Sequence, residues 1–447
     1  MERSLGPVLA DRPRRLARGA SVVRTANRLP FVLTLIAFGL FIPEELSFYL
    51  FGLRLTVIRL IFLLLAPVLL VEGLKKLSAG RYRFVPSDLF VIAAGFWLIY
   101  APANIDGFLP ALNHSGPTVL EFCVGYCVTR IMLCGSDAAL SFASVLCRII
   151  AVVALIGVLD TMTNHRFVHD LAAQLTAPMH HSLDNWEDTH RLGLFRASGP
   201  LEHPILFGFV CAVGMLIAIS IPIRRRLFVT VACGLGTMVA LSSAPIQVMI
   251  MGLGLLAYDS LLSRNSHRWT ILLVAGTFGL FAAFTISNNL IGFIMAHLIF
   301  SPESGYYRVW TWEAVNLYVS QSPWFGLGFG DLPEEINHSI DSLWLVLSIQ
   351  SGYPGAVLVA LSLLGAGRIF TGGRKPELTS AESRLSSALG IVLFLTVYMA
   401  FTVHLWGSAW VLAGLLAGLK AHLSELGYLR RNPARQNLTA SLQPVPS

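Results

Sequence analysis

Residues 138–159 read AALSFASVLCRIIAVVALIGVL, and a stretch of this kind decides the class of fold. It is almost entirely apolar and is as long as the roughly 20 residues that a helix needs to cross the hydrocarbon core of a bilayer. Similar stretches recur along the chain, which is 55% hydrophobic and only 13% charged, with a mean hydropathy of +0.67. This balance is far from that of a soluble domain and predicts a polytopic membrane protein.

We therefore expect an all-α transmembrane bundle of about 12 spans. The first predicted span is the weakest, because Pro43, Glu44 and Glu45 interrupt it. The predicted spans lie near residues 29–46, 54–73, 86–104, 116–134, 138–159, 203–221, 226–242, 244–261, 269–286, 341–366, 386–403 and 405–420.

The positions of the cations predict the orientation, because Lys and Arg accumulate in short cytoplasmic loops. With the N-terminus inside, most of the 32 Lys and Arg lie in cytoplasmic segments or at their edges. The exceptions outside are Arg166, Arg191, Arg196 and Arg308. The net charge of +7 thus reflects the orientation of the chain in the membrane. No basic patch interleaved with aromatic residues predicts binding to nucleic acid.

The spans divide the chain into alternating membrane and loop regions. We expect a basic cytoplasmic segment (1–28), spans 1–5 (29–159), an outer loop (160–202), spans 6–9 (203–286), a large outer loop with catalytic candidates (287–340), spans 10–12 (341–420) and a polar cytoplasmic tail (421–447). The first span has no cleavage site after it, so we expect it to remain as an uncleaved anchor. All six cysteines fall in predicted spans, so neither a disulfide framework nor a thiolate metal site is predicted.

The second outer loop contains the sequence GYYRVWTWEAVNLYVSQSPWFGLGFG, from Gly305 to Gly330. Residues 301–303, Ser-Pro-Glu, supply an N-cap, a proline at the first helical position and an acid near the positive helix end. Aromatic and apolar residues then recur at the spacing of one helix face: Tyr307, Trp310, Ala314 and Leu317. We expect an amphipathic helix at the membrane surface that ends at Pro323 and presents Arg308 toward polar surroundings.

The first outer loop places Arg191 and Arg196 shortly before Ser198-Gly199-Pro200 and His203-Pro204. A guanidinium is a rigid fork of donors that suits phosphate oxygens two at a time. Arginines from the two outer loops can therefore converge on one diphosphate.

Four motifs in order carry a resemblance to a known family. They are Arg196-x-x-Gly199 with His203-Pro204, then Arg308-x-x-x-Trp312, then Pro323-x-x-Gly326-x-Gly328, and then His338 with Ser339 through Gly352. Their order and loop placement resemble the bacterial O-antigen ligase and Wzy-type polysaccharide polymerase family. The resemblance covers roughly residues 190 to 366 in motifs and the whole chain in the number of spans.

The resemblance implies a GT-C-like glycosyltransferase of the bacterial inner membrane, with both termini cytoplasmic and a periplasmic active site. It implies metal-independent, inverting transfer without a cofactor, from an undecaprenyl diphosphate-linked oligosaccharide to a glycan or lipid acceptor. Arg196 and Arg308 would hold the donor diphosphate, with Arg191 and His203 as further substrate-binding residues. His338 would act as base near the acceptor hydroxyl. Membrane lipids and polysaccharide assembly or chain-length proteins are the expected partners.

Preorganised cations can neutralise the charge that develops as a glycosyl diphosphate bond breaks. An imidazole with an ordinary pKa near 6.5 can accept a hydroxyl proton at neutral pH, and base catalysis of this kind typically contributes a factor of about 10² to 10⁴.

The function has alternatives. A polymerase joins lipid-linked repeat units, whereas a ligase passes the finished chain to lipid A-core or another terminal acceptor. The compact second loop and the segment HSIDSLWLVL resemble exopolysaccharide polymerases more than typical ligases, and this resemblance favours the polymerase. A transporter or flippase is less favoured, because the polar groups gather outside the membrane rather than at its midplane. A non-catalytic scaffold of an assembly complex is the remaining alternative.

Several residues also have a purely structural interpretation. Arg308 can pair with Glu313 or lipid phosphate, His338 can cap the tenth span, and His203 can shape a turn. His165 and His169 lie four residues apart, near further His and Asp residues, but no spacing typical of a metal site supports a metal centre.

Overall fold

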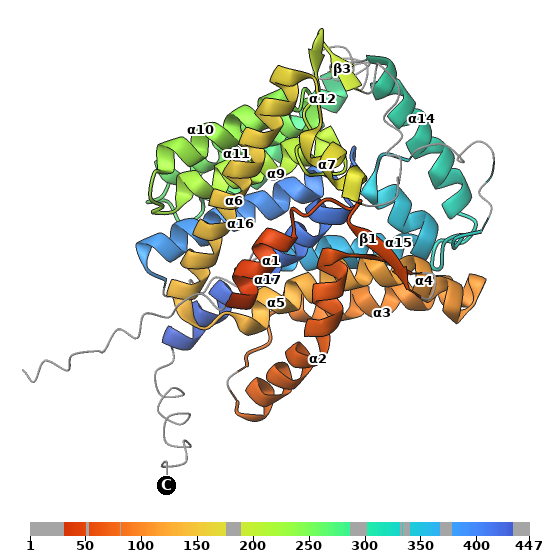
Figure 1. Cartoon of the computed structure of the whole chain (residues 1–447). Coiled ribbons are helices and arrows are strands. Elements are labelled where there is room, and N and C mark those ends of the chain that lie inside the picture. Colours follow the sequence, from red (N-terminus) through yellow and green to blue (C-terminus); the bar gives the residue numbers. More distant parts are fainter. Residues whose placement is uncertain are drawn as a thin grey trace, which may run out of the picture.

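A computed structural model describes residues 31–50, 53–80, 82–175, 189–286, 302–330, 333, 340–366 and 378–431. This part of the chain is a bundle of α-helices with two short β-hairpins, which confirms the predicted all-α class (Figure 1). Six of its helices are long and apolar enough to cross a membrane: α2 (Val57–Ser78), α3 (Pro86–Asp106), α6 (Gly135–Thr163), α11 (Ser243–Leu261), α15 (Leu343–Gly365) and α16 (Ser380–Met399). The chain is a multi-pass membrane protein.

The other predicted spans also fall on helices. The first is short, because α1 ends at Gly39 and the hairpin of β1 (Ser47–Leu50) and β2 (Leu53–Thr56) follows. The remaining helices are α4 (Phe108–Val119), the π-helix η1 (Leu120–Val124), α5 (Gly125–Met132), α7 (Phe167–Leu175), α9 (Pro204–Ser220), α10 (Arg226–Val239), α12 (Arg268–Ile286), α14 (Pro302–Val319) and α17 (Gly407–Arg431).

Small residues allow the central helices to approach closely. A Cβ at Gly414 of α17 would lie 2.5 Å from the Phe122 carbonyl, and one at Gly418 would overlap the Tyr126 carbonyl. These two glycines are four residues apart, the spacing of small residues at helix interfaces in membranes. In α10 a Cβ at Gly236 would lie 2.7 Å from Ala154, so this glycine allows α10 to pack closely against α6.

The loops that connect the helices lie at two opposite ends of the bundle, as their contacts show. At one end Glu45 after α1 meets His169 of α7 (2.6 Å), and Glu202 before α9 meets Ser408 of α17 (3.2 Å). We call this the loop end, since it carries β1–β2, α7 and α14. The opposite end carries the last turns of α17 and is called the C-terminal end. In Figure 1 β3 and α14 lie at the top and the C-terminus at the bottom.

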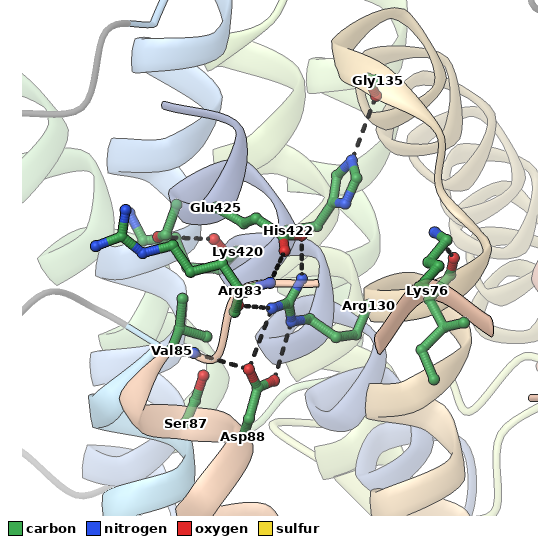
Figure 2. A network of polar contacts seen from close by, with 12 residues as sticks. Lys76, Arg83, Val85, Ser87, Asp88, Arg130, Gly135, Lys420, His422 and Glu425 are labelled. Atoms are coloured by element: carbon green, nitrogen blue, oxygen red, sulfur yellow. Dashed lines mark hydrogen bonds and ion pairs between the residues drawn. The ribbon is translucent and has the colours of Figure 1, made fainter. Parts of the chain in front are cut away.

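A charge network closes the C-terminal end (Figure 2). Arg130 of α5 is 1% exposed and binds Asp88 of α3 through Nε (2.9 Å) and Nη2 (3.1 Å). Its Nη1 donates to Glu425 of α17 at 2.5 Å, and Nη2 also donates to the Arg83 carbonyl at 2.7 Å. The guanidinium further stacks on Tyr82, 4.4 Å from the ring centre. All three guanidinium nitrogens thus have partners, as a buried charge requires.

Candidate functional site

Arg191 and Arg196 flank a tight hairpin at the loop end. Strand β3 (His190–Arg191) pairs with β4 (Leu194–Phe195), and the two residues between them, Leu192 and Gly193, have positive φ values of 54° and 75°. Positive φ at both central residues is the turn geometry that matches the twist of paired strands. The hairpin therefore fixes the backbone positions of both arginines.

Both arginines reach carbonyls at the end of α10. Arg196 Nε donates to the Ala240 carbonyl at 3.5 Å, and Arg191 Nη1 donates to the Leu241 carbonyl at 3.2 Å. The last carbonyls of a helix have no partner within it and carry the negative end of its dipole, so these cations stabilise α10. Arg196 is only 3% exposed. The structure thus brings these two predicted substrate-binding arginines together and gives each a local structural role.

Gly199, the glycine of the first motif, lies where the chain crosses close to the bundle. Its φ is +54°, and a Cβ there would lie 3.1 Å from the Phe207 ring. Its N–H donates to Oδ2 of the buried Asp160 at 2.8 Å. Glycine is needed here for backbone conformation and packing, whether or not a substrate binds.

His203 caps the first turn of α9. Its Nδ1 accepts the N–H of Ile205 at 3.1 Å, so the neutral ring carries its proton on Nε2. The ring centre lies 6.0 Å from that of Trp406. Pro204 at the first helical position completes a strong start signal. The His-Pro pair thus sets where α9 begins.

Arg308 lies on the predicted helix of the second outer loop. Its Nη2 is 3.4 Å from Asp341 Oδ2, so its acidic partner is Asp341 rather than Glu313. The Arg308 side chain is 17% exposed, and its Nε is buried without a hydrogen-bond partner. Helix α14 is held on α15 by an apolar cluster that includes Val315 and Ile349. On the predicted face Tyr307, Trp310 and Leu317 are exposed by 38%, 44% and 64%, as expected for a helix that meets the membrane surface.

The Pro323-x-x-Gly326 motif fills a break in α15. At Ser351 and Gly352 the backbone leaves helical geometry. The Ile349 carbonyl, which the break frees, accepts the Leu327 N–H at 2.6 Å, and the Tyr353 N–H donates to the Pro323 carbonyl at 2.9 Å. A Cβ at Gly326 would overlap the Ile349 carbonyl, so only glycine allows this docking.

Gly328, the last glycine of that motif, lies against Asp106 at the end of α3. Its φ is +73°, and a Cβ there would overlap the Asp106 carboxylate. Asp106 Oδ2 accepts the Phe329 N–H at 2.8 Å. The motif therefore fixes the chain that leaves α14 onto two transmembrane helices. His338, the predicted base, lies outside the described residues, and its role stays a prediction.

Two titratable residues at the loop end were not predicted from sequence. His404, between α16 and α17, lies 5.4 Å from the Trp406 ring, and burial lowers its pKa to about 4. Glu202 is 6% exposed, and burial together with the charge of Glu44 raises its pKa to about 8. Glu202 is adjacent to the His203-Pro204 motif, so the sequence could have indicated it as a candidate. No motif near His404 indicates a functional role for that residue.

The buried arginines at the two ends of the bundle differ in whether their N–H donors have hydrogen-bond partners. At the C-terminal end Arg130 uses its Nε and Nη2 edge to hold Asp88. At the loop end the same edge of Arg166 is buried without hydrogen-bond partners, and so is Arg308 Nε. Burial lowers the pKa of Arg166, and its guanidinium lies 5.6 Å from the Phe195 ring centre. Buried polar atoms without hydrogen-bond partners are rare, and these arginine donors are available to bind an acceptor group.

Within the described part of the chain, no group of three His, Cys, Asp or Glu side chains is placed to hold a metal ion. Comparison with known proteins gives no assignment: no family model matches this chain, and no curated protein matches it significantly.

Proposed function

We propose that this chain is a membrane glycosyltransferase of the O-antigen ligase and Wzy polymerase type, with twelve spans, both termini in the cytoplasm and the loop end in the periplasm. The observation that carries this proposal is the buried Nε of Arg308, which has no hydrogen-bond partner and lies at the loop end, where the sequence motifs also lie. Guanidinium donors that lack a partner suit a phosphate oxygen.

The reaction we propose is inverting transfer from an undecaprenyl diphosphate-linked oligosaccharide. The acceptor oxygen forms a bond to the anomeric carbon from one side, and the bond to the phosphate oxygen breaks on the other. The diphosphate leaves with the electron pair, and the acceptor proton passes to His338. Because the diphosphate is already a good leaving group, the protein chiefly positions the acceptor and neutralises the charge that develops as the glycosyl bond breaks. Arg308 and Arg196 supply the neutralising charge.

Arg308 has a partner that suits this role. Asp341 holds one Nη of Arg308 at 3.4 Å and leaves Nε available. The carboxylate restrains the guanidinium, while the long distance leaves the pair weak enough to rearrange around a diphosphate. For Arg196 the proposal requires a movement away from the Ala240 carbonyl, since its side chain is buried.

Polymerase activity is the form of the reaction that we favour, for the loop features given above, and ligase activity uses the same site. The test is an assay of purified protein in nanodiscs with an undecaprenyl diphosphate-linked repeat unit, alone and with lipid A-core, resolved on a gel. A ladder from the donor alone indicates a polymerase, and product only with lipid A-core indicates a ligase.

Variants at two arginines make this assay specific. Arg308→Lys keeps the charge but not the fork, so product should fall strongly while membrane insertion is retained. Arg268→Lys is the matched control, because Arg268 pairs with Asp259 at the C-terminal end (2.7 Å) and should tolerate the change. Full product from Arg308→Lys, Arg308→Ala and His338→Ala would refute the proposed site.

A further inference from the structure

Several carboxylates at the loop end have a basic side chain as partner. Glu44 pairs with Arg54 (3.3 Å), Glu121 with Arg59 (2.7 Å) and Glu45 with His169 (2.6 Å). The buried Asp160 has no ion pair among the described residues, although its Oδ2 accepts the Gly199 N–H at 2.8 Å. Glu202 is a second buried acid of this kind, since no cation of the described residues lies within ion-pair distance of it. Its carboxylate must be stabilised in another way, because an isolated buried charge is costly.

The geometry around Glu202 is that of a carboxyl pair. Its Oε1 accepts the N–H and the hydroxyl of Ser408, both at 3.2 Å, and its Oε2 is buried without a partner. Glu44 reaches the same point from the turn after α1. A Cβ at Gly407 would overlap Glu202 Oε1 and lie 2.7 Å from Glu44 Oε1. The two carboxylates therefore meet over Gly407, at the start of α17.

Other charged or titratable groups lie on the elements packed around this pair. They are Glu45 in the same turn as Glu44, Arg54 on β2, Arg59 on α2, Glu121 on η1, Asp160 on α6, Arg166 after α6, His169 on α7, His203 before α9 and His404 before α17. Arg54 contacts the far oxygen of Glu44, Oε2, and not the oxygen near Gly407. His169 bonds Glu45 and the Leu201 carbonyl. These contacts leave Glu202 facing a like charge.

We propose that Glu44 and Glu202 form a proton-binding site, in which the pair holds one proton at neutral pH and the proton resides on Glu202. Two carboxylates that share a site cannot both ionise cheaply, so one keeps its proton. The unpartnered Oε2 is where a carboxylic acid hydroxyl would lie. The raised pKa of Glu202, about 8, agrees with this geometry.

The proton links three parts of the loop end: the turn after α1, the chain before α9 and the start of α17. When Glu202 ionises, two negative charges oppose each other at this junction and weaken it. The inference does not rest on the proposed glycosyl transfer, because it concerns the protonation state of a buried pair and not the fate of a substrate.

The sign of the stability effect follows from linkage. The pKa of Glu202 rises from 4.5 to about 8 on folding, so between these values the folded state binds more protons than the unfolded state. Glu202 therefore contributes stability that is fully present below pH 4.5 and is lost as the pH rises through about 8.

The experiment is infrared spectroscopy of the full chain in nanodiscs during a pH titration, which detects the C=O stretch of a protonated carboxylic acid. The wild type should show such a band at neutral pH and lose it near pH 8. Glu202→Gln should remove the band and also remove the alkaline loss of thermal stability. Glu44→Gln should move the transition to lower pH, since it removes the like charge. Asp170→Asn, at an exposed carboxylate of the same end, should leave the band unchanged.

The proposal would be overturned if the wild type shows no protonated carboxyl component that is lost near pH 8, or if that component persists in Glu202→Gln. If Glu202→Gln does not fold, Glu44→Gln decides. A transition moved to lower pH supports the pair, and an unchanged transition refutes it.

Discussion

Replacing Arg130 with methionine should destabilise the protein severely. Arg130 is 1% exposed and satisfies two carboxylates, Asp88 and Glu425, which are 3% and 7% exposed. Methionine fills much of the volume of the side chain but leaves both acids buried without their cation. Removing one member of a buried ion network costs about 3–5 kcal/mol, a large part of a typical stability of about 5–15 kcal/mol. The loss of stacking on Tyr82 adds to this cost.

The measurement is the free energy of unfolding from denaturant titration in mixed micelles. Lys75→Met is the matched control, because Lys75 and Glu72 form a pair that is 65% and 48% exposed. A pair exposed to this extent contributes about 0–1 kcal/mol, so the control should stay within about 1 kcal/mol of the wild type. The triple variant Arg130→Met, Asp88→Asn, Glu425→Gln should recover part of the loss, since it removes the uncompensated charges. If Arg130→Met alone loses no more than Lys75→Met, the network does not stabilise the C-terminal end and our reasoning is wrong.

Three further predictions concern the loop end. Arg308→Ala should lower product formation by about 10²- to 10³-fold in the nanodisc assay without reducing the amount of folded protein, as expected for loss of a charge-stabilising donor. Product within about twofold of wild type would contradict this role. Gly326→Ala should unfold or displace the segment after α14, because the residue has a φ of +80° and a Cβ would overlap the Ile349 carbonyl. Limited proteolysis should then cleave near α14 faster than in Gly330→Ala, where a Cβ meets nothing within 4 Å. Finally, the pKa of His404 falls from 6.5 to about 4 on folding, so the unfolded state binds more protons between these values and stability should fall as the pH drops through this window. His404→Gln should flatten that part of the thermal stability profile, and an unchanged acid slope would exclude His404 as its source.

Local patterns in the sequence were sufficient to predict several features of this protein. A helix in a membrane is recognised by about 20 consecutive apolar residues, and this depends on no distant part of the chain. The same holds for the starts of α14 at Pro302 and of α9 at Pro204, each of which has a proline at the first helical position. The predicted N-cap residue of α14, Ser301, lies outside the described residues. Such signals are short-range, so one sequence contains them in full.

The partners of the charged residues depended on the tertiary structure. Asp88 and Glu425 lie far apart in the chain and meet on Arg130 only because α3, α5 and α17 pack together. Gly326 and Gly328 are recognisable as a motif, but their contacts with the broken helix α15 and with Asp106 are not.

For the candidate site, too, the sequence indicated the residues, and the tertiary structure determined their partners. Residue type, loop position and the resemblance of short motifs to a known family selected Arg191, Arg196, His203, Arg308 and His338 from the sequence. Only the structure placed Arg191 and Arg196 against the end of α10, paired Arg308 with Asp341 and brought Glu44 to Glu202. The physical reason is that membrane insertion is decided by the apolar content of each segment, whereas charge pairing is decided by distances of a few ångströms between segments that only packing brings together.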